Sequence, residues 1–246
     1  MEKEEKRAIM KSEIIIIIPT YNARESIIDT IRLIFAEISS ASLIIVDDNS
    51  PDGTVQLVNS HYGKDKRVSV VKREGKGGRG SAVIAGLKEG LKIKSAKYFI
   101  EMDADLCHNP KYIKKLVEKC QKFDVVIASR YLPKSRIYGW TLKRKVMSFC
   151  INTFAKIVLR IPIKDYTDGF RCYSRKAVDF ICSYEIKSRG YIVLSEIAYL
   201  CYRKGLRFAE VPIDFYFKPV TKSNLNIKEV KEALITIIRL PFQRYD

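Results

Sequence analysis

Several features that would identify common classes of protein are missing from this 246-residue chain. Its six cysteines are scattered and form no C-x-x-C pair, which argues against both a zinc site and a disulfide framework. No run of about 18 apolar residues occurs, so the sequence predicts no membrane-spanning helix. No signal peptide is recognisable at its start. These absences together lead us to expect a reducing, cytoplasmic compartment.

Histidine is scarce as well, since the chain contains only His61 and His108. Acidic residues are fewer than basic ones. The 45 basic and 28 acidic residues differ by 17, which favours anionic partners such as phosphorylated ligands or an anionic membrane surface. Nucleic acid is not expected, because helix-turn-helix, RNP and zinc patterns are missing. The apolar share of 47% is sufficient for a large core.

Buried strands alternate with helical patterns in the first half of the chain. Ile14 to Ile18 is apolar at every position, as in a strand covered on both faces of a parallel sheet. This alternation predicts an α/β fold: a doubly wound, mostly parallel sheet with helices on both faces. The predicted strands are 14–18, 43–46, 68–71, 98–102 and 125–128, and the predicted helices are 27–38, 81–91 and 112–120.

The second half is less regular. Its spacing predicts helices over 140–160, 191–202 and 226–240, a turn over 165–171 and a strand over 208–217. The helix over 140–160 mixes basic and apolar residues, so it either packs in the core or lies at a membrane surface. We expect a flexible leader at 1–12, one domain at 13–225 and a C-terminal amphipathic helix within 226–246.

Polar residues follow four of the predicted strands: PTYN at 19–22, Asp47-Asp48, Asp103-Ala104-Asp105, and SRY at 129–131. In a doubly wound sheet the carboxyl ends of the strands form one rim, where ligands bind. Two carboxylates at the end of a buried strand need a partner. A solvated turn is one reading of D-x-D, and Mg²⁺ or Mn²⁺ on a diphosphate is the other.

The motifs as a series are more specific than any one of them. They are PTYN, DDNSPDGT, a Lys/Gly loop at 75–80, MDADLCHNP, SRY, W-x-x-x-R-x-x-x-S-x-x-x-N from Trp140 to Asn152, D-x-T-x-GFR and EVPI. In this order they resemble the inverting family 2 glycosyltransferases with the GT-A fold. Within that family they look most like the polyprenyl-phosphate sugar synthases, of the dolichol-phosphate mannose synthase type, from about Ile14 to Leu225.

The resemblance implies a nucleotide-sugar donor, a divalent metal, and a polyprenyl or dolichyl phosphate acceptor at a membrane. It also implies roles for single residues. The donor-binding residues would be Pro19, Tyr21, Val46, Asp48, Asp103, Ala104, Asp105, Arg130 and Lys218. Asp103 and Asp105 would hold the metal, and Asp105 and Arg130 would be catalytic, with Arg130 reaching the phosphates. The acceptor-binding residues would be Arg144, Ser148 and Lys222.

The resulting hypothesis is transfer of mannose from GDP-mannose to the lipid phosphate with inversion. A phosphate monoester is already ionised at pH 7, so no strong general base is needed, and we expect His108 to be structural. Asp47 is expected to form a turn, and Arg171 either shapes the acceptor side or is a surface cation. Basic residues at 134–145 predict peripheral attachment to the cytoplasmic face of a membrane, with a membrane subunit as a further hypothesis.

Three departures from the family pattern keep alternatives open: Ala23, Cys107 and the loop from Lys218 to Leu225. The loop has Lys218 in place of an arginine, and lysine lacks the bidentate fork. The alternatives are a polyprenyl-phosphate glucose synthase that uses UDP-glucose, a family 2 transferase with a non-lipid acceptor, and an inactive regulatory subunit.

Overall fold

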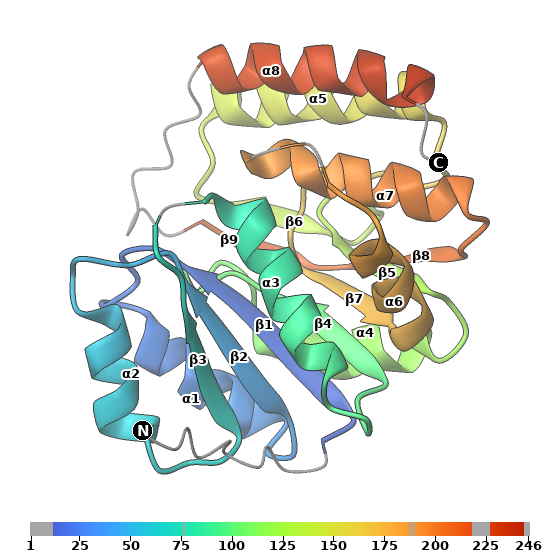
Figure 1. Cartoon of the computed structure of the whole chain (residues 1–246). Coiled ribbons are helices and arrows are strands. Elements are labelled where there is room, and N and C mark those ends of the chain that lie inside the picture. The colour runs from blue at the N-terminus through green and yellow to red at the C-terminus, as the bar shows by residue number, and fades with distance from the viewer. Residues whose placement is uncertain (1–11, 76, 187, 189, 218–226, 244–246) are drawn as a thin grey trace.

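The computed structural model describes residues 12–75, 77–186, 188, 190–217 and 227–243 (Figure 1). A seven-stranded sheet forms its centre, in the order β3-β2-β1-β4-β7-β5-β8, and β7 is the strand of this sheet that runs antiparallel to its neighbours. The strands are β1 (Ile14–Thr20), β2 (Ser42–Asp47), β3 (Val68–Lys72), β4 (Tyr98–Glu101), β5 (Val125–Ser129), β7 (Arg171–Ser174) and β8 (Phe208–Pro212). The predicted α/β fold class is therefore confirmed.

Helices cover both faces of this sheet, and β1 explains why. Its successive isoleucines point alternately to the two faces: Ile15 and Ile17 enter one apolar cluster, Ile16 and Ile18 the other. The first cluster is closed by α3 (Arg79–Leu91), α6 (Arg175–Ser183) and α7 (Val193–Arg203), and the second by α1 (Ile27–Glu37), α2 (Thr54–Tyr62) and α4 (Ile113–Cys120). Each fully buried isoleucine contributes about 1.5–3 kcal/mol.

Two further helices lie side by side at one end of the molecule, beyond α7 (Figure 1). They are α5 (Leu142–Leu159) and α8 (Ile227–Arg239), which agree with the helices predicted over 140–160 and 226–240. Pro241 lies in a short 3₁₀ turn, η3 (Leu240–Phe242), and two more such turns are η1 (Pro110–Tyr112) and η2 (Gly190–Ile192). Within the described residues we find no helix with the length and apolar character needed to cross a membrane.

The strand predicted over 208–217 is wrong in one respect, because it is divided at Ile213. The first part, β8, pairs with β5, and the second, β9 (Asp214–Tyr216), pairs with β6 (Arg136–Tyr138) in a separate two-stranded sheet. The N–H of Ile213 still donates to Ser129, whereas its carbonyl accepts from Arg136. The chain therefore changes partners at this residue, which a run of apolar side chains does not reveal.

The turn predicted over 165–171 leads directly into β7, and its last residue is the first of the strand. Arg171 is fully buried, and its guanidinium donates to the carbonyls of Asp168 (2.8 Å), Leu194 (2.6 Å) and Tyr166 (3.0 Å). The suggestion of a surface cation is thus wrong. The buried charge is tolerated because three carbonyl oxygens accept its hydrogen bonds.

The predicted boundaries of the leader and the domain stay predictions, since residues 1–11 and 218–226 lie outside the described residues. The leader predicted over 1–12 extends too far by Ser12, which is buried and whose hydroxyl donates to the carbonyls of Ile14 and Ser40, each at 2.8 Å. Ser12 therefore belongs with the folded part of the chain.

Candidate active site

The carboxyl ends of β1, β2, β4 and β5 form one rim, and the antiparallel β7 begins at the same rim. Asp47, at the end of β2, is fully buried and accepts from the hydroxyls of Thr20 (3.0 Å) and Ser50 (2.6 Å) and from the N–H of Ser50 (2.8 Å). These bonds hold the turn that follows β2, as predicted for this residue.

Asp48 lies at the rim, and both of its carboxylate oxygens have partners. Arg73 Nη1 is 2.5 Å from Oδ1, and the N–H of Gly78 donates to Oδ2 at 3.0 Å. Both partners come from the segment between β3 and α3. Asp48 therefore holds this segment at the rim. A ribose hydroxyl that bound Asp48 would share the carboxylate with Arg73 and with the N–H of Gly78.

The other predicted residues of the donor pocket differ in their exposure. Tyr21 is 41% exposed at the rim, and Pro19 beside it is half-buried. Val46 is fully buried in the cluster beneath α3, where its side chain packs near Gly86. The side chain of Val46 thus lies in the core rather than on the rim.

Asp103 lies at the end of β4 and is paired with Arg79, the first residue of α3. Arg79 Nε and Nη2 approach Oδ1 of Asp103 at 2.8 and 2.7 Å, and Nη1 bonds to the buried Glu101. Burial alone would raise the pKa of Asp103, but the charge and the hydrogen bond of Arg79, together with the charges of other nearby groups such as Arg130, outweigh it and hold the pKa below its ordinary value. Asp103 is therefore ionised near neutral pH.

The carboxylate oxygens of Asp103 and Asp105 fit a divalent cation whose remaining coordination positions are filled by a bound ligand. Asp105 is half-buried, and its Oδ1 accepts from the N–H of Cys107 at 3.0 Å. In the described part of the chain these hydrogen bonds engage Oδ1 of Asp103 and of Asp105, and Oδ2 of Asp103 lies 3.9 Å from Nδ1 of His108, beyond hydrogen-bonding distance. Among the described residues no group of three or more His, Cys, Asp or Glu is arranged to hold one. Two carboxylate oxygens plus diphosphate oxygens are what Mg²⁺ or Mn²⁺ takes in such sites.

His108 connects Asp103 to the loop before β7. Its Nδ1 accepts from the N–H of Asp103 at 3.1 Å, so the proton of the neutral ring lies on Nε2, which is 3.4 Å from Oδ1 of Asp168. The ring is 3% exposed and stacks on Phe170. Both nitrogens have protein partners, in agreement with the prediction that His108 is structural.

Arg130 is held by two buried carboxylates of the same loop. Its Nε and Nη2 donate to Asp165 at 2.8 and 2.7 Å, and its Nε lies 3.0 Å from Oδ2 of Asp168. Burial would raise the pKa of Asp165, but Arg130 lowers it below the ordinary value; at Asp168 burial prevails and the pKa is raised. Arg130 also donates to the hydroxyl of Thr167 at 2.8 Å. The guanidinium is thus fixed within the protein.

The helix α5 carries two predicted acceptor residues, Arg144 and Ser148, and it meets this loop through Asn152. Ser148 accepts a hydrogen bond from the hydroxyl of Tyr131 at 2.7 Å. Asn152, one turn later, donates to Thr167 at 3.2 Å and accepts from the N–H of Tyr166 at 2.7 Å. Arg144, one turn earlier, lies over the ring of Trp140 at 4.9 Å. The spacing of four residues therefore reflects one face of a helix.

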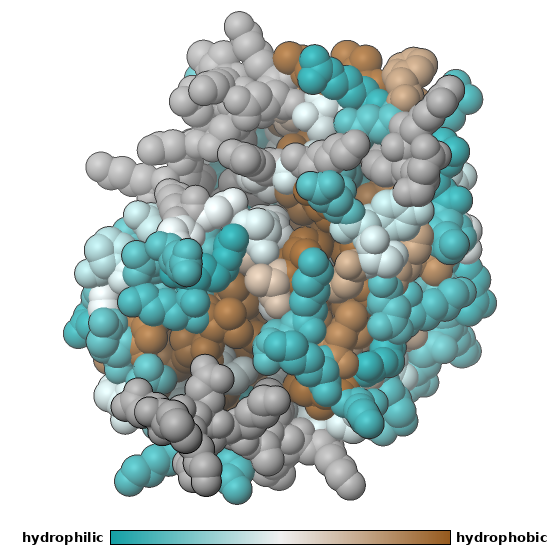
Figure 2. All heavy atoms as spheres, viewed as in Figure 1, coloured by the Kyte–Doolittle hydropathy of each residue, from teal (hydrophilic) through white to brown (hydrophobic). Residues whose placement is uncertain are grey.

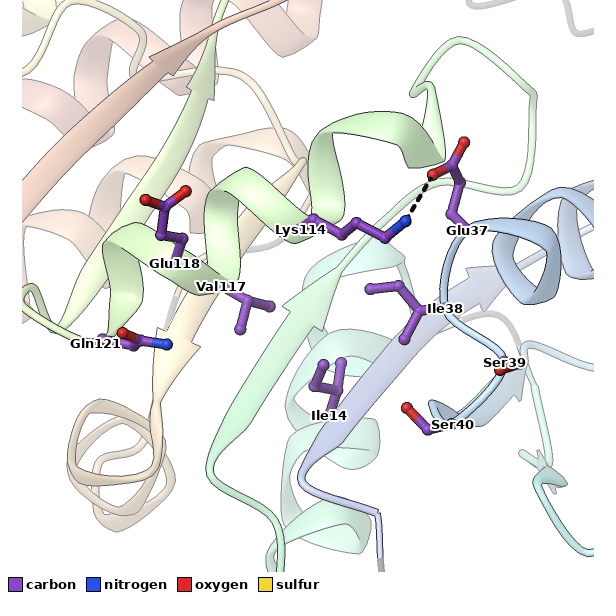
Figure 3. Close-up of a pocket in the computed structure, with 9 residues that line it drawn as sticks. All are labelled: Ile14, Glu37, Ile38, Ser39, Ser40, Lys114, Val117, Glu118 and Gln121. Atoms are coloured by element: carbon purple, nitrogen blue, oxygen red, sulfur yellow. Dashed lines mark ion pairs between the residues drawn. The ribbon is translucent and has the colours of Figure 1, made fainter.

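Not every hollow of the molecule belongs to this rim. A cavity of about 380 Å³ is lined by the first residue of β1, Ile14, and by residues at the end of α1 and along α4 (Figure 3). Lys114 and Glu37 form an ion pair across it at 3.5 Å. It lies at the amino end of β1, opposite the rim that carries Asp48 and Asp103.

Residues 15–181 match the family described as glycosyl transferase family 2. The chain belongs to this family. It is 33% identical over 226 residues to undecaprenyl-phosphate mannosyltransferase of Micrococcus luteus, covering 92% of this chain and 93% of that one. It is 32% identical over 225 residues to polyprenol monophosphomannose synthase of Mycolicibacterium smegmatis, covering 91% and 84%. The resemblance inferred from the motifs is thereby confirmed.

Solved structures agree with this family 2 assignment at the level of the fold. Glucosyl-3-phosphoglycerate synthase of Mycobacterium tuberculosis, in complex with Mn²⁺, UDP and glucosyl-3-phosphoglycerate, has a TM-score of 0.66 at 17% identity, covering 94% of this chain and 79% of that one. A mannosyltransferase of Pyrobaculum calidifontis in complex with GDP-Man and Mn²⁺ has a TM-score of 0.60 at 16% identity, covering 86% and 58%.

This family 2 glycosyltransferase site contains residues that sequence reasoning did not select, above all Arg79, Asp165 and Thr167. Arg79 follows a glycine-rich loop that gives no sign of its partners, and Asp165 lies 35 positions from Arg130. The position of Asp165 at the start of the motif D-x-T-x-GFR is the sequence signal that could have marked it as a site residue. The predictions for Lys218 and Lys222 concern positions outside the described residues.

Proposed function

We propose that this glycosyltransferase transfers mannose from GDP-mannose to a polyprenyl or dolichyl phosphate, with inversion and with a divalent metal. One observation carries the proposal: a continuous series of hydrogen bonds and ion-pair contacts joins the predicted donor side to α5, which carries two predicted acceptor residues. It runs from Asp103 through His108, Asp168, Arg130 and Thr167 to Asn152 on α5. The names of the two relatives, a mannosyltransferase and a phosphomannose synthase, support the sugar and the acceptor.

On the donor side, Pro19, Tyr21 and Asp48 would contact the base and ribose, and Lys218 the phosphates. Asp103 and Asp105 would hold Mg²⁺ or Mn²⁺ through their remaining oxygens. When bound, the metal would act as a Lewis acid that neutralises charge on the leaving diphosphate. The solved relatives with Mn²⁺ support a divalent cation here.

On the acceptor side, Arg144, Ser148 and Lys222 would bind the lipid phosphate. Its oxygen is ionised at pH 7 and can attack the anomeric carbon without a general base. The engagement of both nitrogens of His108 supports a mechanism without one. Because Arg130 is paired with Asp165 and Asp168, we assign it to positioning the loop between α5 and β7 rather than to direct phosphate contact.

We further propose that α5 and α8 rest on the cytoplasmic face of a membrane. Figure 2 shows hydrophobic and hydrophilic atoms together at the end of the molecule that these helices form. Lys143, Lys145 and Lys156 accompany the apolar residues of α5, and such residues gain about 1 kcal/mol each near anionic lipid. The exposed apolar residues are Leu142 (77%), Val146 (54%), Phe149 (60%), Ile157 (67%), Ile235 (48%), Ile238 (50%) and Phe242 (83%).

Cosedimentation with vesicles that contain anionic lipid tests this surface. The double variant Phe149→Ser/Ile157→Ser should lose most of its vesicle binding, because two exposed apolar side chains are removed from the contact. Leu33→Ser on α1, where Leu33 is 48% exposed, is the matched control and should bind like wild type. Equal binding of all three proteins would contradict the lipid surface, and a failure of wild type to bind would favour a membrane subunit instead.

The activity itself is tested by transfer of labelled mannose from GDP-mannose to a short-chain polyprenyl phosphate, with Mg²⁺, Mn²⁺ or EDTA. Asp105→Asn should abolish a metal-dependent product, whereas Asp29→Asn, which changes an exposed carboxylate on α1, should not. Turnover with UDP-glucose in place of GDP-mannose would contradict the donor. Product without added metal and with intact Asp105→Asn activity would contradict the metal site.

A further inference from the structure

The glycine-rich loop places the side chain of Arg79 at the end of β4, beside Glu101 and Asp103. Gly78 has a φ of +88°, which favours glycine, and α3 starts at the next residue. The side chain of Arg79 is 14% exposed, and all three guanidinium nitrogens approach carboxylates. Nη1 bonds to Glu101, and Nε and Nη2 to the same oxygen of Asp103, so two carboxylates are held by one fork.

Gly169, in the motif D-x-T-x-GFR, is explained by the same side chain. A Cβ at this position would lie 2.7 Å from Cζ of Arg79, which is closer than side-chain contacts allow. The φ of Gly169 is not in the left-handed region, so its backbone does not require glycine. The guanidinium itself occupies the space, and its Nη2 also faces the carbonyl of Gly169 at 3.4 Å.

We propose that Arg79 is a positioning residue that orients Asp103 so that one oxygen of this carboxylate faces the metal. The proposal rests on the metal site of the proposed function. Arg79 donates to Oδ1 of Asp103, and Nδ1 of His108 accepts from the backbone N–H of the same residue. The lack of a side chain at Gly169 leaves the room that the Arg79 guanidinium needs in this arrangement. Arg79 thus orders the metal-binding carboxylate before donor and metal arrive.

A purely structural role, neutralising the buried Glu101, would need the charge of Arg79 but not its fork. The test therefore uses two substitutions that keep a positive charge. Arg79→Lys removes the two-point hold on Asp103, and Gly169→Ala displaces the guanidinium without removing it. Gly75→Ala in the same loop is the matched control, because no described atom lies within 4 Å of the position of its Cβ.

Mn²⁺ binding would be measured by electron paramagnetic resonance, alone and with GDP or UDP, together with thermal unfolding of each protein. We expect Arg79→Lys and Gly169→Ala each to weaken Mn²⁺ binding about tenfold, as supporting residues of metal ligands do. The double variant should be weakened about tenfold and not about a hundredfold, since both changes act through one guanidinium. Gly75→Ala should bind like wild type.

Wild-type affinity in a folded Arg79→Lys protein would overturn the proposal, and so would fully additive losses in the double variant. Either result leaves the metal site itself intact. Wild-type protein that binds no Mn²⁺ with either nucleotide would instead overturn the metal proposal and this one together, so the two failures are distinguishable.

Discussion

The ion pair between Arg130 and Asp165 is a buried interaction whose removal should be costly. The side chain of Asp165 is fully buried and that of Arg130 is 7% exposed. Asp165→Asn would keep the size of the side chain but leave the guanidinium without its main counter-charge. Breaking one partner of such a pair costs about 3–5 kcal/mol. Asp168 remains beside Arg130 at 3.0 Å, so we expect the lower end, about 3 kcal/mol.

For a chain of this length, 1 kcal/mol corresponds to about 2–4 °C in melting temperature, so Asp165→Asn should melt roughly 6–12 °C below wild type. Differential scanning calorimetry at pH 7 measures this. Asp65→Asn is the control, because Asp65 and Arg67 form an ion pair whose side chains are 23% and 30% exposed. Its loss should cost about 0.2–1 kcal/mol.

The same pair gives a pH dependence of definite sign. Arg130 holds the folded-state pKa of Asp165 below its unfolded value of 3.8. The stabilisation is therefore present above this value and is lost as the pH falls through the lower, folded-state pKa. The gap between wild type and Asp165→Asn should narrow below about pH 4. If Asp165→Asn melts within about 2 °C of wild type at pH 7, the reasoning about this buried pair is refuted.

Other substitutions and treatments have equally defined outcomes. Gly86→Ala should lower the melting temperature by roughly 2–12 °C, since its Cβ would lie 2.4 Å from Cγ2 of Ile17 in a packed core, and Gly75→Ala should not. Asn152→Ala should lower the free energy of unfolding, measured in urea, by about 1–3 kcal/mol, because the N–H of Tyr166 loses its acceptor. An unchanged free energy would mean that this hydrogen bond does not stabilise the protein. EDTA should stop sugar transfer without changing the far-ultraviolet circular dichroism, and Mn²⁺ should restore it.

The first five strands could be predicted because each is a run of β-branched or aromatic residues between polar turns. Ile14 to Ile18 is the extreme case, and its register with β2 and β4 is as expected for a central parallel strand. The strand β7 could not be predicted in this way. Its sequence, RCYS, begins with a cation that is buried because three carbonyls accept its hydrogen bonds: those of Tyr166 and Asp168 in the preceding loop, and that of Leu194, 23 positions further along the chain.

The candidate site shows the same division. The position of Asp103 and Asp105 at the end of a strand follows from local sequence. The partners of charged residues do not, because they depend on how segments far apart in the chain meet. The family resemblance implies that Arg130 reaches the phosphates, whereas its pairing with Asp165 and Asp168 is set by the return of the chain along β7.

The antiparallel strand β7 has a consequence for the order in which the protein can assemble during synthesis. β4 and β5 follow one another along the chain, yet β7 lies between them and pairs with both. A nascent chain that has reached Ser129 therefore still has an open edge at β4, and open edges readily pair with other chains. Only when Arg171 to Ser174 have been made can this edge close. The contact of His108 with Asp168, in the loop before β7, also needs this part of the chain, so the candidate site is incomplete until it has been made.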